Sequence, residues 1–241
     1  MIKLNDITFG YKDIPALKNI SVNINKGDSI ALIGPNGCGK STLLKLITAV
    51  VYPDYGEYYF EDIRIDVKKM QENRFAKLFH KRIGFVFQNS DSQLFCSNVY
   101  DEVAFAPIQM GLSEDEIKIR VNDSMNLLGI DMLGQRSPYN LSGGEKKRVA
   151  IASVLSHNPD VLILDEPMNG LDPKTKNFLR ELIIKLNVCG KTIICSTHDF
   201  EYVEGIFKRA LVFSNEHEII RDDDYDYVVK DRKFLMDNNI L

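Results

Sequence analysis

The chain has 241 residues, 44% of them hydrophobic and 27% charged, with a formal net charge of −4 at pH 7. This globular composition excludes a disordered chain and a fibre, and the acidic balance gives no support to a nucleic-acid partner. No stretch approaches the roughly 20 mostly apolar residues of a membrane-spanning helix, and the first residues lack a signal-peptide core.

The first elements of the chain alternate between apolar and polar residues. Alternation over 2–9 and 20–24 predicts strands that have one face in water. The apolar run 29–33 predicts a buried strand. The glycine-rich residues 34–39 cannot be helical, and apolar residues then recur with helical spacing over 43–50.

The middle of the chain changes from strands to helices. Residues 58–60 and 83–87 predict two more strands, whereas 88–141 is mostly helical in pattern and could form a subdomain of its own. A Ser-x-x-Glu capping box opens a predicted helix over 113–129, and a second box opens another over 142–155.

The last third returns to strands. The uninterrupted apolar runs 161–164 and 192–195 are typical of strands buried on both faces of a parallel sheet. A helical pattern over 179–186 lies between them. Strands that alternate with helices predict an α/β fold. We expect the acidic run 222–224 to be a solvated turn.

One segment carries a phosphate-binding pattern, G-x-x-x-x-G-K-[ST], between a predicted strand and a predicted helix. It reads Gly34-Pro35-Asn36-Gly37-Cys38-Gly39-Lys40-Ser41-Thr42. Glycines let backbone N–H groups point at phosphate, and the helix start adds positive charge. Lys40 would reach the β and γ phosphates, and the Ser41 hydroxyl would bind Mg²⁺. The plainer alternative is a glycine-rich turn. Cys38 lies inside the loop, where it is either a small residue that fits or a thiol whose modification would block nucleotide binding.

Two carboxylates follow the buried run 161–164. Asp165 and Glu166 stand at the end of a strand, where α/β proteins bind their ligands. Asp165 would hold Mg²⁺ through water, and Glu166 would position and deprotonate a water molecule, which contributes roughly 10²–10⁴ in rate. The alternative is a solvated acidic strand end.

The segment Leu141-Ser142-Gly143-Gly144-Glu145 resembles the signature of the ATP-binding cassette (ABC) transporter ATPases. Other motifs of that family occur in the same order over essentially the whole chain. They are Tyr11, Gln88 after the strand 85–87, Asn169-Gly170-Leu171-Asp172, and Ser196-Thr197-His198-Asp199.

The resemblance implies a role for each motif. Tyr11 would stack on adenine, and His198 would contact the γ-phosphate. Gln88 would be the Q-loop glutamine, which binds the metal ion and takes part in catalysis. Without the resemblance, Tyr11 could be an ordinary strand aromatic and His198 a structural histidine. Residues 169–172 resemble the D-loop, but Met168-Asn169 replaces the small pair common before Gly-Leu-Asp, so communication between sites could differ.

The signature also has a physical reading. Ser142 caps a helix whose Gly143 and Gly144 leave backbone N–H groups open, which makes a second anion site. The resemblance implies a head-to-tail dimer, in which the phosphate loop of one subunit and the signature of the other enclose each ATP.

The implied fold is an α/β, P-loop ABC-ATPase core with a mainly parallel sheet, an N-terminal antiparallel β subdomain and a helical subdomain. We expect a single domain over 1–241. About 1–87 and 160–241 would form the core and β subdomain, and about 88–159 the helical subdomain with the signature.

A finer resemblance lies in residues 85–95 and 99–107 and in the Glu-Lys-Lys-Arg that ends at Arg148. These segments resemble the ATPases of energy-coupling factor importers, which take up cobalt, nickel or vitamins. The cofactors would be ATP and Mg²⁺. The partners would be a second ATPase subunit (an identical chain or a paralogue), an integral membrane coupling subunit and a cargo-binding membrane subunit. The chain would sit peripherally on the cytoplasmic face of the cell membrane. The alternative is an ATPase for another ABC transporter class, such as an exporter.

Overall fold

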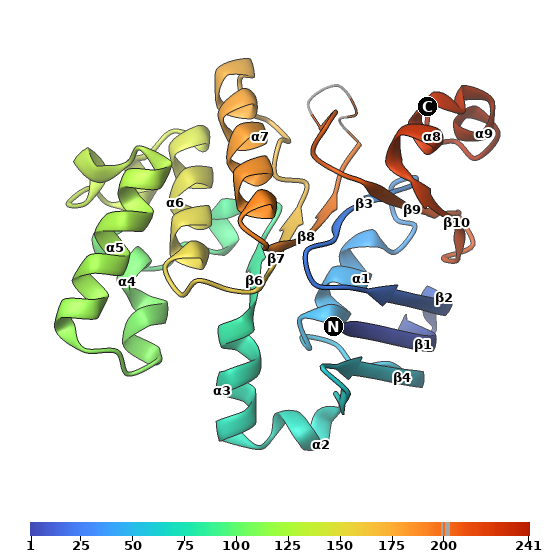
Figure 1. Ribbon diagram of the computed structural model, residues 1–241, viewed down its shortest axis with the longest axis horizontal. Coiled ribbons are helices and arrows are strands. Elements are labelled where there is room, and N and C mark those ends of the chain that lie inside the picture. Colours follow the sequence, from blue (N-terminus) through green and yellow to red (C-terminus); the bar gives the residue numbers. More distant parts are fainter. Residues whose placement is uncertain (199, 201–202) are drawn as a thin grey trace.

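The computed structural model describes residues 1–198, 200 and 203–241, and Figure 1 shows two sheets with helices around them. The smaller sheet has the order β2-β1-β4-β5, and its neighbouring strands are antiparallel. Its strands are β1 (Ile2–Tyr11), β2 (Ile14–Ile24), β4 (Tyr55–Phe60) and β5 (Ile63–Arg64).

The larger sheet has the order β10-β9-β3-β8-β7-β6, and only β10 runs antiparallel to its neighbour. Its strands are β3 (Ser29–Ile33), β6 (Ile83–Val86), β7 (Val161–Asp165), β8 (Thr192–Ser196), β9 (Arg209–Phe213) and β10 (Ile219–Asp224). The predicted α/β class, with a mainly parallel sheet and an antiparallel N-terminal sheet, is therefore confirmed.

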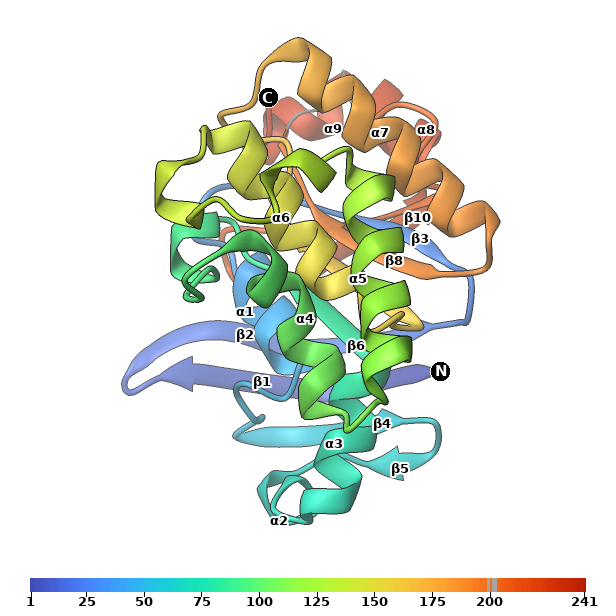
Figure 2. The ribbon, with the colours of Figure 1, turned by 90° about the vertical axis from the view of Figure 1, so that its left-hand side faces the viewer.

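Helices lie on both faces of the larger sheet. The helices of the described residues are α1 (Lys40–Ile47), α2 (Val67–Met70), α3 (Asn73–Arg82), α4 (Val99–Gln109), α5 (Glu114–Leu128), α6 (Gly143–Leu155), α7 (Pro173–Val188), α8 (Tyr225–Lys230) and α9 (Arg232–Asp237). Helices α2 and α3 lie near the smaller sheet. Single 3-10 turns lie at Ser90–Ser92, Asp131–Leu133 and Pro138–Asn140. Figure 2 shows α4, α5 and α6 gathered on one side of the molecule.

The central strands supply two separate cores. In β7, Leu162 and Leu164 face a cluster that contains side chains of α4 to α9, whereas Val161 and Ile163 face a cluster with α1 and the smaller sheet. All four side chains are buried. This two-sided burial explains why the sequence shows a continuous apolar run there instead of alternation. Helix α1 lies between the two sheets (Figure 1).

Both predicted capping boxes form. The Ser113 and Ser142 hydroxyls each accept the backbone N–H three residues on, and Glu116 and Glu145 each accept the backbone N–H of their serine. Helix α5 ends at Gly129, whose φ of 63° is left-handed and suits glycine.

Two local expectations were wrong. Helix α1 stops at Ile47, because Ala49 takes a left-handed φ of 55° and the Val50 N–H donates back to the Lys45 carbonyl at 2.9 Å, so Val50 lies outside the helix and is exposed. The acidic run 222–224 is part of strand β10, not a turn. Two arginines on the same sheet pair with its carboxylates, Arg209 with Asp222 at 2.6 Å and Arg221 with Asp223 at 3.0 Å.

Among the described residues, no helix combines the length and the apolarity that crossing a membrane requires.

His157, just after α6, gives the fold a pH dependence. It is 8% exposed, and neither ring nitrogen has a hydrogen-bond partner among the described residues. Burial first, and then the nearby charges of Arg120 and Lys191, lower the pKa of His157 from 6.5 to about 4. Between these pH values, His157 therefore binds a proton in the unfolded chain but not in the folded chain.

We predict that neutral His157 makes its full contribution to the free energy of unfolding above about pH 6.5. This contribution is lost as the pH drops toward 4, so the free energy of unfolding falls. The loss from this group amounts to about 3 kcal/mol at most. Urea titrations of wild type and His157→Phe at pH 7 and pH 4.5 measure it. The variant should lose less stability between the two pH values, and an equal loss would contradict the assignment.

Candidate functional site

The predicted phosphate loop lies between β3 and the start of α1. Gly39 immediately precedes α1 with a φ of 111°, and a Cβ there would lie 2.2 Å from the Ala16 carbonyl oxygen, so only glycine fits. No side chain caps the start of α1. Its first backbone N–H groups therefore have no intrahelical partner and present the positive end of the helix dipole.

Lys40 is folded against this loop. It is 7% exposed, and its ammonium donates to the Gly34 carbonyl at 2.6 Å and to the Pro35 carbonyl at 2.9 Å. The charge is thus held by weak carbonyl acceptors at the mouth of the loop. A phosphate oxygen would be a stronger, charged acceptor for the same ammonium.

Asp165, at the end of β7, joins three segments. Its Oδ1 accepts from the Ser41 hydroxyl at 3.1 Å and from the Ser196 hydroxyl at 2.5 Å. Asp165 and Ser196 are register partners on neighbouring parallel strands, so the ends of β7 and β8 meet here. A carboxylate beside a hydroxyl is a donor set that suits Mg²⁺, which prefers oxygen ligands. The residues present therefore fit a magnesium ion.

Glu166 follows Asp165 in an unusual conformation. Its φ of 48° lies in the left-handed region, which residues other than glycine seldom adopt. Its backbone N–H donates to the Ser196 hydroxyl at 2.9 Å, and its Oε2 contacts Nδ1 of His198. The Glu166 side chain is 11% exposed and that of His198 is 57% exposed. Strained backbone of this kind is often found at active sites.

These elements surround one hollow of about 220 Å³. Its lining consists of Asn36, Gly37, Gly39, Lys40, Ser41, Thr42, Gln88 and Glu166. The structure thus brings the phosphate loop, the predicted Q-loop glutamine and the predicted general base together, with Asp165 bonded to Ser41 beside them.

Tyr11 does not line this hollow. It ends β1, is 42% exposed and packs edge to face on Phe9 at 4.9 Å. It stands on the β1–β2 hairpin, whose Ala16 carbonyl abuts Gly39 of the phosphate loop. An exposed aromatic next to the loop is where a base attached to bound phosphates could stack.

The signature residues are also absent from the hollow. Ser142 and Gly143 are exposed at the start of α6, on the side formed by α4, α5 and α6 (Figure 2). A Cβ on Gly143 would meet nothing within 4 Å, whereas one on Gly144 would lie 3.4 Å from the Thr175 hydroxyl. The two hydrogen bonds from Ser142 lower the pKa of Glu145, which keeps the capping carboxylate charged.

Two further sequence expectations concern loops. Met168 belongs to the pair expected to change communication between sites. It is buried in the core that contains α6 and α7, so it anchors the D-loop to that core. Asp199, the last residue of the switch motif, lies outside the described residues.

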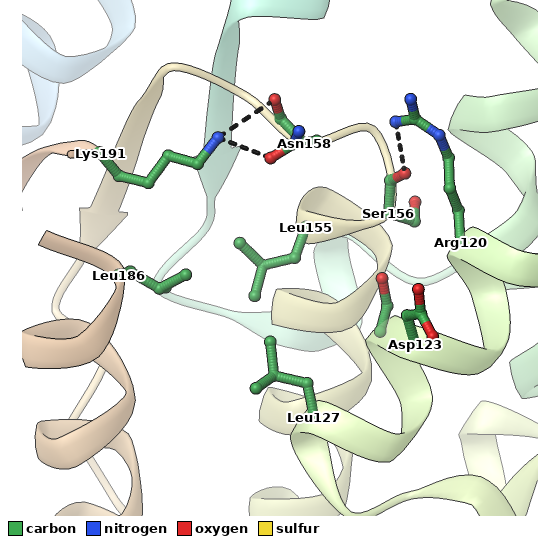
Figure 3. Close-up of a pocket in the computed structure, with 9 residues that line it drawn as sticks. Arg120, Asp123, Leu127, Leu155, Ser156, Asn158, Leu186 and Lys191 are labelled. Atoms are coloured by element: carbon green, nitrogen blue, oxygen red, sulfur yellow. Dashed lines mark hydrogen bonds between the residues drawn. The ribbon is translucent and has the colours of Figure 1, made fainter. Parts of the chain in front are cut away.

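Another hollow, shown in Figure 3, lies between α5, α6 and α7 and contains two cationic side chains. Lys191 donates to the Asn158 side-chain oxygen at 2.6 Å, and Arg120 donates to the Ser156 carbonyl at 3.4 Å. These bonds are typical of cations that satisfy the carbonyl end of a helix, here α6. We assign no ligand to this hollow.

The sequence motifs include Ser196, Lys147 and Gln93 but give none of them an individual role. Ser196 had a usable signal, because it ends a buried strand as Asp165 does and parallel strands end at one edge of a sheet. Lys147 and Gln93 had none. The structure shows both joining α6 to the segment around Gln88.

Residues 17–169 match the protein family described as "ABC transporter". A relative from Clostridium acetobutylicum, named as an ABC transporter ATP-binding protein without a stated cargo, is 58% identical over 241 residues and 100% of both chains. The nickel import ATP-binding protein LarO of Lactiplantibacillus plantarum is 45% identical over 222 residues, which is 92% of each chain.

Solved structures agree with these matches. CbiO1 from Clostridium perfringens, described as part of the ABC transporter complex CbiONQ, has a TM-score of 0.84 and 36% identity over 99% of this chain and 94% of that one. A dimeric bacterial ABC transporter cassette also has a TM-score of 0.84, with 31% identity over 93% of this chain and 98% of that one. The predicted cassette fold is thereby confirmed.

The reactivity of Cys38 reports how well the folded phosphate loop shields its interior from solvent. It is 1% exposed, and burial raises the pKa of its thiol, whereas Cys189 is exposed. We predict that iodoacetamide at pH 7 alkylates Cys38 at least about tenfold more slowly than Cys189, because the thiolate is the reactive form. Peptide mapping by mass spectrometry measures both rates, and in urea they should converge. Equal rates in the folded protein would contradict this.

Proposed function

The chain belongs to the ABC transporter family of ATPases, and from this membership we propose that it powers an energy-coupling factor importer for cobalt, nickel or a vitamin. As a member of the family it binds and hydrolyses ATP. The importer class is supported above all by the 45% identity with a nickel import ATP-binding protein over 92% of both chains. The likeness to CbiO1 supports it independently.

In the proposed site, residues 34–42 hold the phosphates of ATP. The backbone N–H groups at the start of α1 bind phosphate oxygens, and Lys40 exchanges the Gly34 and Pro35 carbonyls for the β and γ phosphates. Tyr11 stacks on the adenine from the adjoining hairpin, with the exposed ring surface that the structure provides.

Ser41, Asp165 and Gln88 would hold Mg²⁺, which neutralises charge on the β and γ phosphates when it is bound. The Ser41–Asp165 hydrogen bond and the position of Gln88 in the same hollow support this set.

Glu166 acts as the general base for the attacking water. Glu166 lines the hollow together with Lys40 and Ser41, and its backbone is left-handed at this point. His198 contacts this carboxylate and stabilises the charge that spreads over the phosphoryl group, together with Lys40.

A second ATPase subunit, identical or paralogous, completes the site. The signature at the start of α6 exposes backbone N–H groups but does not line the chain's own hollow. A head-to-tail pair resolves this, because each signature then binds the nucleotide of the other subunit. The likeness to a dimeric cassette at a TM-score of 0.84 supports the pairing.

An integral membrane coupling subunit, itself joined to a cargo-binding membrane subunit, would dock beside the Q-loop and hold the chain at the cytoplasmic face of the membrane. Phe95 and Phe105 form an exposed edge-to-face pair at 4.9 Å there, and Ile108 is 52% exposed on the same helix as Phe105. Exposed apolar side chains of this kind suit a helix from a partner.

We predict that Glu166→Gln lowers kcat for ATP by at least about a hundredfold, because the amide cannot accept the proton of water. ATP binding should survive, so size-exclusion chromatography with ATP should show a stable dimer. Glu181→Gln, the same exchange at an exposed site on α7, is the control and should keep wild-type turnover. Full activity in Glu166→Gln would remove Glu166 from the mechanism.

The cargo is tested in cells that lack this protein. We predict reduced uptake of radioactive nickel or cobalt, or of a labelled vitamin, restored by the wild-type gene but not by Lys40→Ala. Lys40→Ala removes the cation that binds the phosphates, so the subunit is present without ATP-driven motion. Normal uptake of all these cargoes would contradict the importer assignment and favour another ABC transporter class.

A further inference from the structure

Lys147 is a buried lysine outside the hollow. It lies on α6, is 3% exposed, and its ammonium donates to the Gln88 carbonyl at 2.8 Å and the Phe87 carbonyl at 3.1 Å. A buried ammonium is costly unless it is hydrogen-bonded. Burial lowers the pKa of Lys147 to about 8, in keeping with that cost. The two carbonyls are thus the partners that fix this side chain.

Two neighbouring contacts strengthen the same connection. The Gln93 side chain accepts from the Phe87 backbone N–H at 3.0 Å and donates to the Ala150 carbonyl of α6 at 3.0 Å. Lys146 pairs with Asp91 at 2.6 Å. The segment 87–93 is therefore attached to α6 at three residues, Lys146, Lys147 and Ala150.

The same helix begins with the signature. Ser142 and Lys147 are five residues apart, about 7.5 Å along the helix axis. Because an α-helix is stiff over this length, a displacement of the signature carries Lys147 with it. Through the carbonyls of Phe87 and Gln88, the displacement reaches Gln88, which lines the nucleotide hollow.

We propose that Lys147 is a positioning residue for ATP hydrolysis, which transmits the docking of α6 on the partner subunit's nucleotide to Gln88 of its own site. This inference rests on the dimer proposed above. It assigns to Lys147 no contact with ATP, because its ammonium is engaged by two backbone carbonyls and it does not line the hollow.

The test compares Lys147→Met, which has a similar length but no donors, with Lys118→Met, the same exchange at an exposed position of α5. Lys147→Met should lower kcat about ten- to a hundredfold, as misplaced groups do, with KM for ATP changed less than about twofold. Lys118→Met should behave as wild type. Thermal melting verifies that each variant is folded.

A double-mutant cycle with Gln88→Ala separates this role from general destabilisation. If Lys147 acts through Gln88, adding Lys147→Met to Gln88→Ala should lower kcat by less than a further twofold or so. Lys147→Gln keeps a donor with a shorter reach, should give an intermediate kcat, and replaces Lys147→Met if that variant does not fold.

Wild-type kcat in folded Lys147→Met, or effects of the two exchanges that multiply, would overturn the inference. Failure of the proposed function would be seen separately. ATP turnover would survive Glu166→Gln, or the turnover number per subunit would not rise with protein concentration as a dimeric site requires. The inference about Lys147 can therefore be disproved while the proposed function still holds.

Discussion

The site depends on one buried carboxylate. Asp165 is 6% exposed, and a carboxylate this far from water is costly unless hydrogen bonds replace its hydration. Hydroxyls from Ser41 and Ser196 supply them, and they come from the helix after β3 and from the end of β8. Satisfying Asp165 thus fixes three segments relative to one another.

The rest of the hollow follows from that constraint. Ser196, held by Asp165, accepts the backbone N–H of Glu166 and so sets the turn that directs the Glu166 side chain. Ser41 is the second residue of α1, so its position also fixes that of Lys40 beside it. A single hydrogen-bonded carboxylate therefore orders both the phosphate-binding and the base-bearing sides of the hollow.

The parts that sequence predicts well are those set by local chemistry. The glycines at 34–39, the capping serines Ser113 and Ser142, and the buried strands 161–164 and 192–195 are determined by neighbours in the chain. The carboxylates Asp165 and Glu166 were predictable because strands of a parallel sheet end at one edge.

The parts that it misses depend on distant partners. Helix α3 lies in a strongly charged segment, and its short apolar face, formed by Phe75 and Phe79, has its partner Phe60 on the distant strand β4. The run 222–224 resembles a turn until Arg209 and Arg221 are placed beside it. Lys147 sits in a charged stretch that suggests a solvated helix face, and only the folded chain reveals the Gln88 carbonyl beneath it.

The two glycines of the signature obey different constraints. A Cβ on Gly144 would make van der Waals contact with Thr175 of its own subunit, whereas Gly143 has open space around it. A side chain at Gly143 would leave the isolated subunit folded and able to bind nucleotide. In the proposed pair it would obstruct only the other subunit's site. Such an allele would be dominant negative, since a well-folded defective copy would enter assemblies and disable healthy partners.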